Sequence, residues 1–217
     1  MLATTLRAYR RSRREAADAL QAPAAPQRAD SMIMPLLFRG LDPKAGLSVL
    51  DFGSASSAKV AYFSDRKCRI EFVDLLGELD PALLHEDAEP QDLGKAIESL
   101  LIGGGDRRID IALFWDTLNY LPAHGLSTVQ NCLAKQLHPE SRAHCFSIRH
   151  TETPIPWAEH AFEPGDQIVS KTKTSDPWQA TPHTPSALNR LLPCLHVDRA
   201  ILLRNERLEL LLTPHSD

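Results

Sequence analysis

The sequence contains no long apolar run, and this excludes a membrane-spanning protein at the outset. Nothing in its 217 residues approaches the roughly 18 consecutive apolar residues that a transmembrane helix needs. The beginning of the chain is rich in arginine but is not followed by an apolar core, so it does not resemble a secretory signal. We therefore expect a cytoplasmic protein without a membrane span.

Cysteine is scarce, and the cysteines that are present stand far apart. The four are Cys68, Cys132, Cys145 and Cys194, and none forms a C-x-x-C pair. Reduced thiols in a cytoplasmic protein are their simplest explanation. The histidines show no i, i+4 pairing of the kind that metal-binding helices use, so no metal site is predicted.

The chain also lacks a large excess of charge of either sign. Its formal net charge is −4, so there is no general attraction to nucleic acid or to an anionic membrane. Apolar residues make up 43% of the sequence and charged residues 24%, and both fractions are close to those of globular proteins. The length suits one domain with an appendage and a substantial buried core.

The appendage is expected at the N-terminus. Residues 1–21 carry apolar side chains at roughly helical spacing, with five arginines between them. These are Arg7, Arg10, Arg11, Arg13 and Arg14. We interpret the segment as a solvated helical arm that packs its leucines on the domain; the alternative is a basic arm that docks on an acidic protein partner, RNA or a membrane surface. Residues 22–31 are rich in Ala and Pro and predict a linker, so the domain itself is expected over residues 32–214.

Strands and helices are predicted to alternate through this domain. Five short apolar or alternating runs, each typical of a strand, lie at residues 47–52, 69–74, 83–87, 109–116 and 144–149. Amphipathic helices are expected between most of them. Residues 195–203 and 207–212 are joined by only three residues, which predicts a closing antiparallel hairpin.

Residues 150–185 differ from the rest of the domain. They are rich in Pro, Thr and His, show little periodicity and include Trp157 and Trp178. A connection this long without regular structure is usually a functional lid or a disordered segment. The tryptophans favour an ordered lid or interface, because aromatic rings bury a large area.

Polar residues follow the predicted strands at the points where ligands bind in α/β sheets. Asp51 and Gly53 end the first strand, and small residues follow at the start of a helix, where backbone N–H groups can approach a ligand. Asp74 ends the next strand, where nucleotide-binding folds place an acid that hydrogen-bonds ribose hydroxyls. Asn119 and Tyr120 follow the strand at residues 109–116, whose end stands beside the first if the sheet is parallel. Ordinary turns that bind nothing are the alternative.

These three stretches resemble the class I S-adenosylmethionine-dependent methyltransferases, over roughly residues 32–214. The resemblance implies an α/β fold with a doubly wound, mostly parallel seven-stranded sheet in the order 3-2-1-4-5-7-6, with helices on both faces and a C-terminal antiparallel hairpin. The first motif of that family usually has three glycines at alternate positions. Here Gly53 holds the first position, but Ala55 and Ser57 stand at the other two. Their side-chain atoms reduce the room for close backbone approach, so Ser57 either contributes a hydroxyl or marks a lost site.

The resemblance further implies which residues form the site. Those expected to bind S-adenosylmethionine are Asp51, Gly53, Ser54, Ala55, Ser57, Asp74, Asp87 and Asp116, with Asp74 at the ribose and Asp87 at the adenine. Those expected to face the substrate are Asn119, Tyr120, Trp157 and Trp178. His150, just past the fifth strand, is a candidate base and is predicted with Asp116 as catalytic; a structural histidine is the alternative.

Two functions remain on these grounds, and we favour the first, an enzyme, over the second. The first, which the retained Asp51, Gly53 and Asp74 favour, is a methyltransferase that acts on a small molecule or a protein group by direct transfer, a reaction that needs mainly positioning and desolvation. The second, which the missing glycines favour, is an inactive methyltransferase-like scaffold that binds a protein partner through residues 1–21 or 150–185. A nucleic acid is not the expected partner of a chain whose net charge is neutral to slightly acidic.

Overall fold

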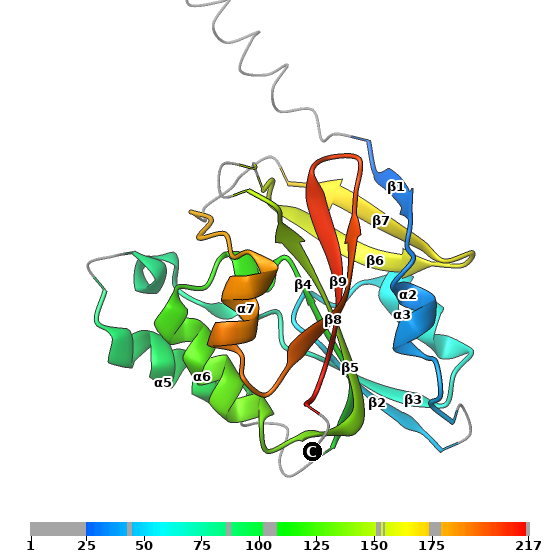
Figure 1. The fold of residues 1–217 in the computed structure, drawn as a ribbon, viewed down its shortest axis with the longest axis horizontal. Coiled ribbons are helices and arrows are strands. Elements are labelled where there is room, and N and C mark those ends of the chain that lie inside the picture. The colour runs from blue at the N-terminus through cyan, green and yellow to red at the C-terminus, as the bar shows by residue number, and fades with distance from the viewer. Residues whose placement is uncertain are drawn as a thin grey trace, which may run out of the picture.

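Two β-sheets organise the protein. A computed structural model describes residues 25–42, 45–85, 88–101, 108–150, 153, 155–173 and 179–215. Within them, a six-stranded sheet has the order β3-β2-β4-β5-β9-β8 and a three-stranded sheet the order β1-β7-β6 (Figure 1). No helix in these ranges is long and apolar enough to cross a membrane. The predicted arm, Asp87 and Trp178 lie outside the described residues.

The larger sheet is mixed and mostly parallel. Its strands are β2 (Leu47–Asp51), β3 (Cys68–Phe72), β4 (Ile109–Trp115), β5 (Leu137–Ile148), β8 (His196–Leu202) and β9 (Arg207–Thr213). Strands β3, β2, β4 and β5 pair in parallel, while β9 runs antiparallel to both of its neighbours, β5 and β8. The predicted C-terminal hairpin is therefore confirmed. The carboxyl ends of β2, β3 and β4 meet at one edge, where open α/β sheets bind ligands.

The third of the seven predicted strands is wrong. Pro81–Leu84, where that strand was expected to begin, form the 3-10 helix η1. Asp80 starts this helix, because its carboxylate accepts a hydrogen bond from the backbone N–H of Ala82 at 2.9 Å. Proline, which has a fixed φ and no N–H, fits the first turn of a helix and not a ladder of strands. The sheet of the described residues thus has six strands and ends at β3.

Helices cover both faces of the larger sheet. They are α2 (Met34–Leu37), α3 (Ser57–Ser64), α4 (Leu75–Glu78), α5 (Pro90–Leu101), η3 (Thr117–Asn119), α6 (Ala123–Leu133) and α7 (Pro185–Leu191). Figure 1 shows α5, α6 and α7 on one face and α2 and α3 on the other. Buried residues form one apolar cluster on each side, the first with Leu93, Ile97 and Val129 and the second with Met34 and Phe63.

The smaller sheet corrects two expectations about irregular segments. Residues 150–185 contain β6 (Ala158–Glu163) and β7 (Gln167–Thr172), which form an antiparallel hairpin, and the expected linker contains β1 (Gln27–Asp30), which pairs with β7. The hairpin turns at Gly165 and Asp166, whose φ angles of 84° and 58° are left-handed and suit a tight turn. Phe162 and Ile168 pack into the same cluster as Met34 and Phe63, so this sheet lies on the face that α2 and α3 cover.

Ser31 ties the two sheets together. Its hydroxyl accepts a hydrogen bond from the Met34 backbone N–H at 2.8 Å, at the start of α2, and donates one to Glu209 of β9. Its own backbone N–H donates to the Asp166 carbonyl oxygen in the hairpin turn at 2.7 Å.

Replacing Ser31 by alanine is expected to lower the free energy of unfolding by about 1–3 kcal/mol. The change removes the hydrogen bond to the Met34 backbone N–H at the start of α2 and takes a donor from the buried carboxylate of Glu209, and denaturant titration measures the loss. Ser186→Ala, at an exposed position in the first turn of α7, is the matched control and should change stability by less than about 0.5 kcal/mol. An equal effect of the two changes would contradict the role of Ser31.

Candidate functional site

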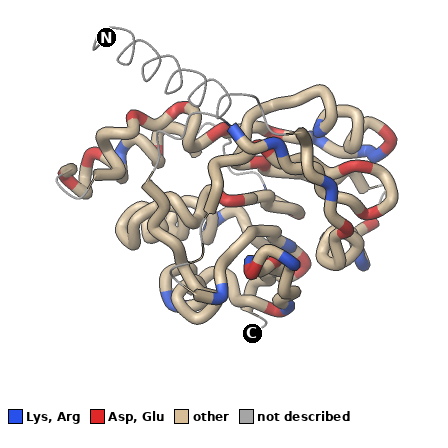
Figure 2. Tube along the Cα trace, turned by 90° about the horizontal axis from the view of Figure 1, so that it is seen from above, with Lys and Arg blue, Asp and Glu red and all other residues tan. Residues whose placement is uncertain are grey.

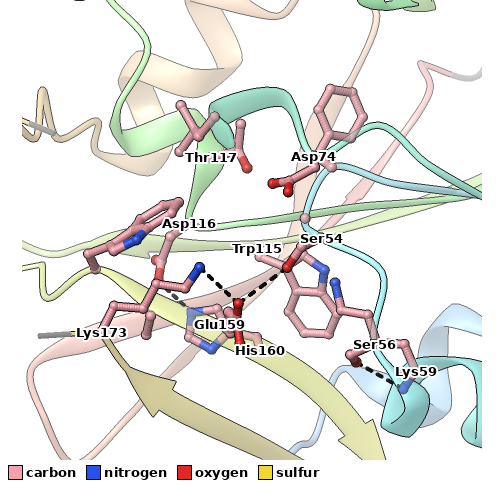
Figure 3. A pocket seen from close by; sticks show the side chains of 15 residues that line it. Ser54, Ser56, Lys59, Asp74, Trp115, Asp116, Thr117, Glu159, His160 and Lys173 are labelled. Carbon is pink, nitrogen blue, oxygen red and sulfur yellow. Dashed lines mark hydrogen bonds and ion pairs between the residues drawn. The ribbon is translucent and has the colours of Figure 1, made fainter. Parts of the chain in front are cut away.

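A small cavity lies at the carboxyl ends of β2, β3 and β4, where the sequence predicts a site. Its walls come from the loops after these strands, from α3 and from β6 (Figure 3). The predicted site residues that line it are Gly53, Ser54, Asp74, Asp116 and Trp157. The fold therefore brings five of the thirteen predicted site residues together at one place.

Asp51 lies beneath this cavity and is fully buried. One carboxylate oxygen accepts hydrogen bonds from the Gly53 backbone N–H at 2.8 Å, from the indole N–H of Trp115 at 2.8 Å and from the ammonium of Lys59 at 2.9 Å. Burial raises the pKa of Asp51, and the positive charge of Lys59 opposes that rise. The carboxylate that the resemblance assigns to the cofactor is thus engaged by groups of the protein itself.

Lys59 fills the space over the glycine turn. It lies in the first turn of α3, which Ser56, and not the predicted Ser57, caps by accepting the Lys59 backbone N–H at 3.3 Å. Its side chain is 5% exposed, and a Cβ atom at Gly53 would lie only 2.8 Å from its Nζ atom. The ammonium therefore occupies the room that a glycine leaves for a ligand.

Lys59 is not among the predicted site residues, although its side chain decides whether this site is open. Lysine is almost never fully buried unless it is paired, so a lysine in an amphipathic helix is ordinarily assigned to the solvated face. A cation near a helix N-terminus is also unfavourable toward the helix dipole. The ion pair with Asp51 offsets both costs, and the sequence signal for it is an acid eight residues before the lysine.

Trp115 closes the cavity from the end of β4. Its φ of 52° is left-handed, a strained conformation for a bulky residue. The indole is 3% exposed, stacks on the His160 ring at 5.7 Å and packs against Phe162 at 4.9 Å. These contacts and the hydrogen bond to Asp51 offset the strain, and they place the ring across the floor of the cavity.

The remaining room is far too small for an adenosyl cofactor. The cavity has a volume of about 50 Å³, whereas pockets for ligands of drug size have roughly 300–1,000 Å³. Asp74, which also has a left-handed φ of 43°, lines the cavity with its carboxylate, as an acid that binds ribose would (Figure 3). Asp74, the acid expected at the ribose, therefore lines the cavity, but the space expected to hold the methionine end is filled, and the residues present do not fit S-adenosylmethionine.

Asp116 belongs to a second buried ionic cluster. One of its oxygens accepts a hydrogen bond from Nε2 of His160 at 2.6 Å, and the other pairs with the guanidinium of Arg207. Nδ1 of His160 accepts in turn from the Ser170 hydroxyl at 2.8 Å. Burial, together with the charge of Lys59, lowers the pKa of His160 to about 3. The histidine is therefore neutral near pH 7, and the cluster joins β6 and β7 to β9.

The structure does not bring the other predicted residues to the cavity. Asn119 and Tyr120 are fully buried and donate hydrogen bonds to the carbonyl oxygens of Phe146 and Ile155, at 2.8 and 3.2 Å. His150 is exposed beyond the end of β5. Two further residues, Ala55 and Ser57, are exposed at the turn into α3. Within the described chain, no group of three or more His, Cys, Asp or Glu side chains is arranged to hold a metal ion.

Comparison with solved structures returns methyltransferases. In all, 58 solved chains match this one. A protein from Sulfolobus solfataricus assigned as a type 11 methyltransferase is 13% identical with a TM-score of 0.49, and the match covers 85% of this chain and 90% of the other. An S-adenosylmethionine-dependent methyltransferase from Clostridium acetobutylicum is 12% identical with a TM-score of 0.47, covering 85% and 97%. The glycopeptide N-methyltransferase MtfA, solved in complex with S-adenosylmethionine, is 10% identical with a TM-score of 0.48, covering 85% and 93%.

No protein-family model matches the sequence, and no curated protein matches it. Identities this low describe a likeness of fold and not a shared activity. The order and direction of the strands in the six-stranded sheet agree with those that the resemblance implies, apart from the missing third strand. By this strand order, the chain has the fold of class I S-adenosylmethionine-dependent methyltransferases.

Proposed function

We propose that this chain is a methyltransferase-like domain that does not transfer methyl groups and that serves as a protein-binding module. The observation that carries the proposal is the ammonium of Lys59, which lies over Gly53 in a buried ion pair with Asp51. The sulfonium of S-adenosylmethionine is itself positively charged. A ligand bound at this place would meet a cation of like sign instead of an open glycine turn.

The free energy needed to break the Lys59–Asp51 ion pair determines how much affinity a ligand loses at this site. Displacing Lys59 from Asp51 leaves a buried carboxylate without its partner, which costs about 3–5 kcal/mol. A ligand that must do this loses roughly 100- to 5,000-fold in affinity, since about 1.4 kcal/mol corresponds to a factor of ten. Trp115 would also have to give up its hydrogen bond to the same carboxylate.

The β6–β7 hairpin supports the same function by covering the site. Glu159 of β6 accepts a hydrogen bond from the predicted cofactor residue Ser54 at 3.4 Å and pairs with Lys173 at 2.8 Å across the mouth of the cavity (Figure 3). These groups are partly exposed and contribute little on their own. The buried contacts of His160 and Phe162 hold the cover in place.

The expected partner is a protein. In Figure 2 basic and acidic residues are interspersed along the described chain, without a broad face of one sign in this view. Such a distribution lacks the basic stripe that is typical of nucleic-acid-binding domains. The regions proposed for contact with the partner are residues 1–21 and the β6–β7 hairpin.

A methyltransferase is the second candidate, and a specific observation favours it. Asp74 and Trp115, both with left-handed backbones, stand at the ends of β3 and β4 on two sides of the cavity. Strained residues of this kind cluster at functional sites. The retained carboxylate of Asp74 would bind the ribose hydroxyls if the hairpin and Lys59 moved away.

Calorimetry of the full chain with S-adenosylmethionine and S-adenosylhomocysteine distinguishes the two functions. We expect no binding heat and no change in melting temperature up to about millimolar ligand, given the loss of affinity argued above. Micromolar binding that Asp74→Ala abolishes, and that the exposed control Glu78→Ala on α4 leaves intact, would overturn the proposal in favour of the enzyme.

A further inference from the structure

An open groove runs between α3 and the turn of the β6–β7 hairpin, outside the site described above. Its volume is about 760 Å³, and its lining includes the apolar side chains of Ala61, Tyr62, Phe162 and Pro164. Residues three and four apart along α3 line it, so one face of this helix forms a wall. The dimensions suit a segment of polypeptide.

The rim of the groove is acidic. Asp65, at the end of α3, and Asp166, in the hairpin turn, are exposed, and neither makes an ion pair with another described residue. Arg66 also lines the groove, but its guanidinium folds over the Tyr62 ring at 4.4 Å and donates to the Tyr62 carbonyl oxygen at 2.8 Å. The groove therefore presents an apolar floor between two carboxylates.

The N-terminal arm of this chain has the complementary pattern. Leu2, Leu6 and Tyr9 recur at helical spacing, and five arginines lie between residues 7 and 14. An amphipathic helix binds a groove by placing its apolar stripe on the floor. Its arginines would then reach the carboxylates of Asp65 and Asp166.

Strand β1 runs toward the groove, with Gln27 opposite Ser170 and Asp30 opposite Gln167, beside the hairpin turn. Arg28 of β1 makes a two-bond ion pair with Glu163, a groove-lining residue, at 2.8 and 3.1 Å. The five residues 22–26 that separate this strand from the arm span at most about 18 Å when extended, which is enough to lead the chain back along the four residues of β1 to the groove. Such a tether holds the arm near the groove at an effective concentration on the order of millimolar.

We infer that residues 1–21 dock in the groove between α3 and the β6–β7 turn of the same chain. The arm covers the exposed Ala61 and Pro164 with its leucines, and its arginines pair with Asp65 and Asp166. This inference does not depend on whether the cofactor site is active.

Trypsin cleavage of the full chain after the arm arginines measures docking directly. With an intrinsic dissociation constant of about 0.1 mM and an effective concentration of about 1 mM, the arm is docked about nine-tenths of the time. Cleavage between residues 7 and 14 should then be about tenfold slower than in a synthetic peptide of residues 1–24. The substitution Asp65→Lys should remove the protection, and so should NaCl at about 0.5 M, because salt at this concentration screens exposed ion pairs. Lysine at the end of α3 favours the helix dipole, so this variant is expected to fold.

Asp198→Lys, which makes the same charge change at an exposed position on β8, is the matched control and should keep the protection. A photocrosslinker in place of Ala61 should form bonds to residues 1–21 within single chains. Equal cleavage rates in the chain, the Asp65→Lys variant and the peptide would overturn the inference. Protection that rises with protein concentration, or crosslinks between two chains, would overturn it in favour of docking between copies.

Discussion

Replacing Lys59 by methionine is expected to lower the free energy of unfolding by about 3–5 kcal/mol. Methionine keeps most of the side-chain volume but removes the ammonium, so Asp51 stays fully buried with one hydrogen-bond donor fewer and no opposite charge. Breaking one side of a buried pair costs more than the pair itself contributes, because the remaining charge is uncompensated. Urea titration at pH 7 measures the change.

Two further variants give this prediction its control. Lys95→Met breaks an ion pair with Asp92 on α5 in which both side chains are more than half exposed, and it should cost less than about 0.5 kcal/mol. Adding Asp51→Asn to Lys59→Met should recover at least half of the lost stability, because the uncompensated charge disappears. If Lys59→Met costs no more than Lys95→Met, the lysine is not locked in the cavity and the main support for a filled site is lost.

Lowering the pH from 7 to 4.5 is expected to remove about 2.5 kcal/mol of stability through His160 alone. Its pKa is about 3 in the folded protein against 6.5 in the unfolded chain. The folded form therefore binds fewer protons, so this contribution is present above pH 6.5 and is lost as the pH falls below it. The cause is burial, reinforced by the charge of Lys59.

The comparison with a variant isolates this one group from the other residues that titrate. In His160→Gln the slope of stability against pH between 6.5 and 4.5 should be shallower by about 1.2 kcal/mol per pH unit on average. His124→Gln, at an exposed position on α6, should leave the slope as it is in the original chain. Denaturant titrations at four pH values are sufficient, and parallel curves for the original chain and His160→Gln would contradict a buried neutral histidine.

Local sequence patterns predicted the strands and helices whose own side chains are buried in a regular pattern. Strands β2 and β4 lie inside the sheet and read as continuous apolar runs, and the closing hairpin follows from two strands joined by three residues. The pairing of β1 with β7 escaped prediction for the opposite reason. It joins Arg28 to Val169, far apart in the sequence, through backbone hydrogen bonds that leave little trace in side-chain periodicity. The third strand failed because Pro81 favours a helical turn.

The sequence by itself determined the order of the six strands of the larger sheet and the place of the acid and glycine turn at Asp51 and Gly53. Only the tertiary structure decided whether the space above that turn is open. Three residues fill that space: Lys59 of α3, Trp115 of β4 and His160 of β6. Each of them is compatible with the helix or strand in which it lies. They fill the cavity because the fold brings their three ends within hydrogen-bond or ring-stacking distance, and such convergence between distant segments is not encoded in any local pattern.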